Sequence, residues 1–127
     1  MVAARHYQYR KTRSNVTSGG LGTMGYGLPA SIGVQVAHPE SLVINVAGEA
    51  SWLMNMQEMA VLAEENLNVK IILLDNRSLG LVHQIQDLFY GGRFIAVNYP
   101  KPVDFAGIAN CFGIASTRLG EESQPAA

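Results

Sequence analysis

The sequence has little charge, one cysteine and no long hydrophobic run, and each absence excludes a class of protein. Only 15% of the 127 residues are charged, against about 25% in typical soluble domains. The formal net charge of −1 excludes a basic nucleic-acid-binding surface. The single cysteine, Cys111, cannot form an internal disulfide, which favours a reducing, cytoplasmic location. No apolar run approaches the ~18 residues of a membrane span, so we expect no membrane partner.

The composition of the chain predicts one folded domain. Hydrophobic residues make up 48% of the chain, enough to exclude intrinsic disorder. We expect an irregular basic lead-in over 1–18, the domain itself over 19–119, and a frayed polar tail over 120–127. Six of the 13 glycines fall within 15 residues, at Gly19, Gly20, Gly22, Gly25, Gly27 and Gly33.

The pattern of apolar residues predicts strands alternating with helices. Apolar, β-branched runs over 42–47 and 69–74 predict two strands buried on both faces. Helices are expected over 28–37, 54–65, 79–89 and 103–112, with a third strand over 114–118. This alternation predicts an α/β fold in which a parallel sheet carries helices on both faces.

Two polar segments follow the two predicted strands. In parallel sheets, ligands bind outside the carboxyl ends of the strands, where this sequence has Gly48-Glu49-Ala50-Ser51 and Asp75-Asn76-Arg77-Ser78. The 24 residues between Ala50 and Asp75 accommodate one helix and one strand, so a βαβ unit would bring the two segments together. A carboxylate, an amide oxygen and a backbone carbonyl, at Glu49, Asn76 and Ser78, are hard ligands of the kind that Mg²⁺ or Ca²⁺ accepts.

Helix starts near these segments offer phosphate ligands. The Ser51 hydroxyl and the backbone amides of Gly80 and Leu81 could hold phosphate oxygens. Together with the oxygen ligands, they indicate a metal-bridged diphosphate.

The glycine segment has more than one interpretation. Residues 20–25, GLGTMG, satisfy the G-x-G-x-x-G pattern of dinucleotide-binding proteins, but that motif needs a strand delivering its first glycine. The preceding residues 13–18 do not have a strand pattern. A plainer interpretation is that the glycines let a helix pack closely on a sheet.

Three blocks of the sequence, in this order and spacing, carry a more specific resemblance: TSGGLGTMGYGLPASIG (17–33), VINVAGEASWLMNMQEMA (43–60) and VKIILLDNRSLGLVHQIQDLFY (69–90). The stretch over 17–113 resembles the C-terminal domain of thiamine-diphosphate-dependent enzymes. Within them it looks most like the large subunit of acetohydroxyacid synthase, also called acetolactate synthase. The resemblance implies the thiamine-diphosphate-binding fold, incomplete relative to the full-length family.

The resemblance also implies roles for individual residues. The family's Gly-Asp-Gly and Asn-Asn motifs map onto Gly48-Glu49-Ala50 and Asp75-Asn76, which makes Glu49, Asn76 and the Ser78 carbonyl the implied Mg²⁺ ligands. The implied contacts to thiamine diphosphate come from Gly22, Met24, Gly48, Ala50, Ser51, Gly80 and Leu81. Among these, Met24 matches the residue that props the cofactor into its bent conformation.

The implied reaction needs more protein than this chain supplies. The family decarboxylates pyruvate and joins the product to a second 2-keto acid, a step in branched-chain amino acid biosynthesis. Its active site lies between this domain and a pyrimidine-binding domain of another subunit. We therefore assign no catalytic acid or base here, and expect a homo-oligomer or a complementary pyrimidine-domain chain as partner.

Three departures from the family's motifs favour an alternative function. Glu49 is one methylene longer than the family's Asp, Ala50 replaces Gly, and Asp75 adds a negative charge near a diphosphate. Each change would weaken cofactor binding. The alternative is a non-catalytic, cofactor-impaired homologue that acts as a structural or interaction module.

Overall fold

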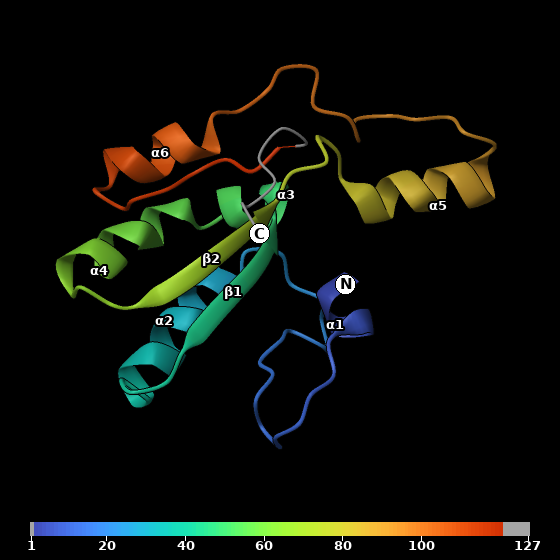
Figure 1. Cartoon of the computed structure of the whole chain (residues 1–127). Coiled ribbons are helices and arrows are strands. Elements are labelled where there is room, and N and C mark those ends of the chain that lie inside the picture. Colours follow the sequence, from blue (N-terminus) through green and yellow to red (C-terminus); the bar gives the residue numbers. More distant parts are fainter. Residues whose placement is uncertain (1, 121–127) are drawn as a thin grey trace.

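The computed structural model describes residues 2–120 and has two parallel strands at its centre. Strand β1 (Val43–Gly48) pairs with β2 (Val69–Leu74), with Val43 opposite Val69 and Gly48 opposite Leu74. The remaining elements are α1 (Val2–His6), α2 (Gly27–Ala37), α3 (Glu49–Leu53), the 3₁₀ helix η1 (Met56–Glu58), α4 (Met59–Glu64), α5 (Gly80–Tyr90) and α6 (Phe105–Cys111) (Figure 1). The α/β class and the parallel sheet are therefore confirmed.

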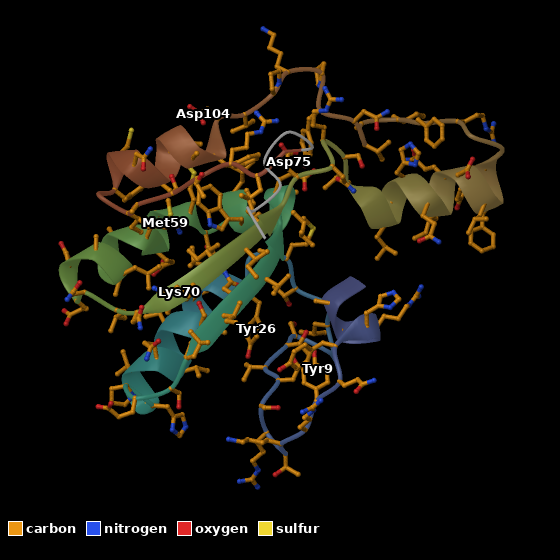
Figure 2. The ribbon with its side chains drawn as sticks, viewed as in Figure 1. Tyr9, Tyr26, Met59, Lys70, Asp75 and Asp104 are labelled. Atoms are coloured by element: carbon orange, nitrogen blue, oxygen red, sulfur yellow. The ribbon has the colours of Figure 1, made fainter. Side chains whose placement is uncertain are left out.

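One interior cluster holds the helices to the sheet. Its most buried members come from α2, α3, α4 and α6: Leu28, Trp52, Met59, Leu62 and Ala109. Met59 has no exposed surface, and Figure 2 shows it beside α6. Val69, Ile71 and Leu73 pack against the cluster, so alternate residues of β2 face it, as strand geometry requires.

The opposite face of the sheet is less covered than the sequence predicted. The side chains on that face, Ile44, Val46, Ile72 and Leu74, are between 42% and 50% exposed. The sequence predicted that both faces of the strands are buried. Within residues 2–120, only the face toward the interior cluster is covered. An apolar run shows that a strand can be buried, but it does not say which elements cover each face.

The segment between the two strands differs from the single helix expected over 54–65. The helix α3 begins directly after β1, the chain turns at Met54 and Asn55, and η1 and α4 follow. Asn55 lies at this turn, and its side-chain amide donates to the Gly25 carbonyl oxygen at 2.8 Å. This contact with the glycine segment explains the break, since short polar side chains offer hydrogen bonds that compete with helix continuation.

Two further expectations need correction. The third strand over 114–118 does not form: Ser116 instead donates its hydroxyl to the Ala106 carbonyl oxygen at 2.8 Å, which folds this segment against α6. The lead-in over 1–18 contains the five-residue helix α1 where no helix was expected. The expected tail over 120–127 lies outside the described residues, apart from Gly120.

The helix α5 stands apart from the rest of the fold. It projects away from the end of β2 (Figure 1), and none of its residues is buried. Its last residue, Tyr90, is followed by Gly91, whose φ of 60° is left-handed and whose N–H donates to the Gln86 carbonyl oxygen, as helix-terminating glycines do. No helix among the described residues combines the length and apolar character of a membrane span.

Candidate cofactor and metal site

The two polar segments predicted to meet do meet at the carboxyl edge of the sheet. Gly48 and Leu74, the last residues of β1 and β2, are paired. Directly beyond them, the Ser78 backbone N–H donates to Glu49 Oε1 at 2.9 Å. The βαβ geometry expected from the spacing is therefore confirmed, and Glu49 lies against the segment that holds Asn76 and Ser78.

The segment after β2, residues 75–78, is shaped by its own side chains. Asp75 Oδ1 accepts from the Arg77 N–H at 3.0 Å, and Asn76 Oδ1 accepts from the Ser78 N–H at 3.1 Å and the Ser78 hydroxyl at 3.2 Å. Such Asx turns fix a tight loop. Gly80 leaves room for them, because a Cβ at position 80 would lie 2.8 Å from Asn76 Nδ2.

A strap formed by residues 97–99 runs beside this loop. The Tyr99 N–H donates to the Arg77 carbonyl oxygen at 2.9 Å, and the Leu79 N–H donates to the Val97 carbonyl oxygen at 2.8 Å. Ser78 and Asn98 face each other as an isolated antiparallel bridge between these two bonds. The sequence predicted only a loop over 93–102, because no strand-length alternation marks the strap.

The strap fixes the direction of the Ser78 carbonyl group. Each peptide unit is planar and trans, so its N–H and C=O point in opposite directions. The Arg77 C=O and the Leu79 N–H both face the strap, and therefore the Ser78 N–H and the Ser78 C=O both point away from it. The Ser78 N–H meets Glu49 and Asn76 on that side, so the Ser78 carbonyl oxygen faces the same side as the other two predicted metal ligands.

Among the charged side chains at this edge of the sheet, Glu49 is the most buried. Glu49 is only 3% exposed, and its side chain has one hydrogen bond, from Ser78, with no ion pair in the described part of the chain. A buried carboxylate is normally paired with a positive charge or coordinated to a metal. A carboxylate, an amide oxygen and a carbonyl oxygen on one side of the loop fit a hard divalent cation.

A small cavity lies beside Glu49. Its volume is about 20 Å³, room for about one water molecule, and its lining includes Tyr99, Arg77, Lys101 and Asp75. Figure 2 shows Asp75 at the carboxyl end of β2. Burial raises the pKa of the Tyr99 phenol above its usual 10.0, and the negative charge of Glu49 raises it further. Tyr99 and Lys101 could not be predicted from the sequence, since nothing in it places residues so distant in the chain beside Glu49.

The glycine segment is attached to the same edge of the sheet. The Gly25 N–H donates to Ser51 Oγ at 3.0 Å, while the Gly25 carbonyl accepts from Asn55 at 2.8 Å. Ser51 and Glu49 both belong to the short helix α3, so the contact joins the glycine segment to the oxygen donors. The chain before these glycines is irregular over 14–18, which confirms that the strand required by a dinucleotide motif is missing.

The remaining predicted cofactor contacts belong to the glycine segment, to the end of β1 and start of α3, and to the first turn of α5. Gly22 has a φ of 65° and donates to the Ser18 carbonyl oxygen at 2.7 Å, while the Met24 side chain is 41% exposed. Gly48 ends β1 and Ala50 is the second residue of α3. Gly80 and Leu81 form the first turn of α5, where backbone N–H groups lack intrahelical acceptors.

These features define an α/β domain in which oxygen donors from Glu49, Asn76 and Ser78 gather beyond the carboxyl ends of two parallel strands. Comparison with known sequences gives the family: residues 1–126 match the thiamine pyrophosphate enzyme, C-terminal TPP binding domain. This chain belongs to that family, so the predicted resemblance is confirmed, and the match extends beyond residues 17–113.

Individual relatives are acetolactate synthases. The chain is 47% identical over 127 residues to the isozyme 1 large subunit of Escherichia coli (strain K12), covering 100% of this chain and 23% of that protein. It is 44% identical over 119 residues to a probable large subunit of Methanococcus aeolicus, covering 94% and 20%. It is 53% identical over 90 residues to the chloroplastic synthase 2 of Nicotiana tabacum, covering 71% and 14%. The chain therefore spans less than a quarter of each relative.

Proposed function

We propose that this chain forms the diphosphate-binding half of a thiamine-diphosphate site of the acetolactate-synthase type. Mg²⁺ would be held by the Glu49 carboxylate, the Asn76 amide oxygen and the Ser78 carbonyl oxygen. The observation that carries the proposal is the convergence of these donors from two strand ends, one of them a buried carboxylate without an ion pair in the described part of the chain.

The chain's other residues would bind and orient the cofactor. The Ser51 hydroxyl and the first-turn amides of Gly80 and Leu81 would contact the diphosphate, beside Gly48 and Ala50. The backbone of Gly22 and the side chain of Met24 would face the pyrimidine end. When bound, thiamine diphosphate supplies the nucleophilic carbon for decarboxylating pyruvate and joining the product to a second 2-keto acid.

The partner in this proposal is a second copy or a complementary chain that carries a pyrimidine-binding domain. We assign no catalytic acid or base to the described residues. The half-exposed sheet face and α5, with Leu88 65% and Phe89 76% exposed, supply apolar surface for such a contact, since large apolar patches mark interaction sites. The setting we propose is branched-chain amino acid biosynthesis in a reducing, cytoplasmic compartment.

One observation favours the alternative of a non-catalytic interaction module. Ala50 is half-buried in α3, directly after the buried Glu49, and places a Cβ where the family has Gly. The same apolar surfaces would serve a structural partner. The two proposals differ in whether cofactor binds.

A chimeric enzyme distinguishes the cofactor-binding half-site from the interaction module. Residues 1–127 would replace the matching segment of the Escherichia coli isozyme 1 large subunit, and acetolactate formation from pyruvate would be measured with added thiamine diphosphate and Mg²⁺. We expect cofactor-dependent turnover below that of the parent enzyme, and none from the isolated chain. A chimera that folds and assembles but binds no cofactor would support the module instead, and turnover by the isolated chain would contradict the half-site.

A further inference from the structure

The bond between Glu49 and Ser78 joins the start of α3 to the loop after β2. Glu49 opens α3, directly after β1, and Ser78 lies four residues beyond the end of β2. Glu49 Oε1 lies 2.9 Å from the Ser78 nitrogen, and Asn76 Oδ1 lies 3.1 Å from it. Two acceptor oxygens thus converge on one N–H, and of these two only the Glu49 oxygen comes from another element of the fold.

The length of the Glu49 side chain makes this contact possible. Asp has one methylene fewer, which withdraws the carboxylate by about 1.5 Å. Starting from 2.9 Å, the distance to the Ser78 nitrogen would then exceed the ~3.2 Å limit of an ordinary N–H···O hydrogen bond. From the sequence alone, the extra methylene of Glu49 looks like a defect in a metal ligand. In the structure it lets the carboxylate reach the Ser78 N–H.

Restraints act on the loop from both of its sides. The strap holds the Arg77 carbonyl and the Leu79 N–H on one side, and Glu49 holds the Ser78 N–H on the other. With the peptide units on either side of Ser78 fixed, its carbonyl oxygen keeps its direction. The bond uses the Ser78 N–H and leaves this carbonyl available to a cation.

We propose that Glu49 is a latch that holds residues 75–79 in their ligand-presenting arrangement before any cation or cofactor binds. The latch itself does not depend on the proposed function, but its use in cofactor binding rests on it. Glu49 is thereby a positioning residue for the Asn76 amide oxygen and the Ser78 carbonyl as well as a ligand. The loop is preorganised, so less ordering accompanies cation binding.

Two substitutions distinguish the effect of the length of the Glu49 side chain from the effect of its charge. Glu49→Gln keeps the length and an oxygen that can accept from Ser78, and it removes the charge. Glu49→Asp keeps the charge and removes the reach. The exposed acid Glu64 provides the matched control, Glu64→Gln, because it changes charge by the same amount away from the loop.

The measurement is amide hydrogen exchange at Ser78 by nuclear magnetic resonance, in protein treated with a chelator and containing no cofactor. We expect exchange about tenfold faster in Glu49→Asp, since a hydrogen bond to a charged group contributes about 1.5 kcal/mol or more. Glu49→Gln keeps a neutral hydrogen bond worth about 1 kcal/mol, so its exchange should be only about two- to threefold faster, and Glu64→Gln should match the parent chain. A folded Glu49→Asp variant with parental exchange would overturn the latch, as would equally fast exchange in Glu49→Gln.

A second measurement needs no substitution. A scalar coupling between the Ser78 amide nitrogen and the Glu49 carboxyl carbon, across the hydrogen bond, should be present in the chelated parent chain, and its absence would contradict the latch. Adding thiamine diphosphate and Mg²⁺ tests the proposed function separately: Glu49→Asp should retain cofactor binding and Glu49→Gln should lose it. Failure to bind in every variant would count against the proposed function and leave the exchange result intact.

Discussion

Replacing Gly25 with alanine should lower the free energy of unfolding by about 3 kcal/mol. Gly25 has a φ of 85°, and a Cβ there would lie 2.7 Å from Asn55 Nδ2 and 3.1 Å from Met54 Cβ. A side chain in this backbone region costs about 1–2 kcal/mol. Moving Asn55 would also break its 2.8 Å bond to the Gly25 carbonyl, worth about 1 kcal/mol. Urea unfolding followed by circular dichroism measures the loss.

The control for this substitution is Gly33→Ala. Gly33 lies inside α2, and a Cβ added there would meet no atom within 4 Å, so alanine should raise stability by about 0.5–1 kcal/mol. The two alanines should thus shift the unfolding midpoint in opposite directions. A Gly25→Ala protein as stable as the parent would show that the glycine segment does not pack against α3 as described.

Truncating Met59 to alanine should cost about 3 kcal/mol. Met59 is fully buried and belongs to the cluster that joins α2, α3, α4 and α6, and large-to-small changes at such sites typically cost about 2–5 kcal/mol. Met54→Ala is the matched control, because Met54 is 54% exposed and its loss should change stability by less than about 0.5 kcal/mol. Similar losses for both, measured by the same urea unfolding, would mean that the cluster is not the core.

The burial of these methionines was only partly predictable from their spacing in the sequence. Helical spacing predicts that Met54, Met56 and Met59 lie in a core or interface, yet Met54 is exposed and Met59 is not. The chain turns at Met54 and Asn55 because Asn55 bonds to Gly25, 30 residues earlier. A long-range contact of this kind leaves no local periodicity. The sequence therefore predicted one helix over 54–65, where the structure has a turn followed by η1 and α4, and it did not predict α3.

The strands and their ends were predictable for a physical reason. The second strand was expected over 69–74 and forms over Val69–Leu74, because a short, mostly apolar run with three β-branched residues, Val69, Ile71 and Ile72, favours a strand. Parallel pairing then dictates that the segments after the strands meet. The spacing therefore predicted that Glu49, Asn76 and Ser78 lie together, independently of the family resemblance.

The strap was not predictable from local sequence. Val97 is only 2% exposed, but its neighbours Ala96 and Asn98 are exposed, and one buried residue gives no periodicity. Its pairing with Ser78 depends on a non-local bridge. The expected strand over 114–118 failed for the converse reason: its apolar residues fit a strand, but Ser116 bonds to α6 instead.

Isothermal titration calorimetry of the isolated chain with thiamine diphosphate and Mg²⁺ tests the central claim most directly. The proposed function, in which this chain forms the diphosphate half of the site, predicts a cation-dependent heat of binding at millimolar cofactor. The heat should disappear when a chelator replaces Mg²⁺. No heat at millimolar cofactor, from a chain shown to be folded, would contradict cofactor binding by this domain on its own.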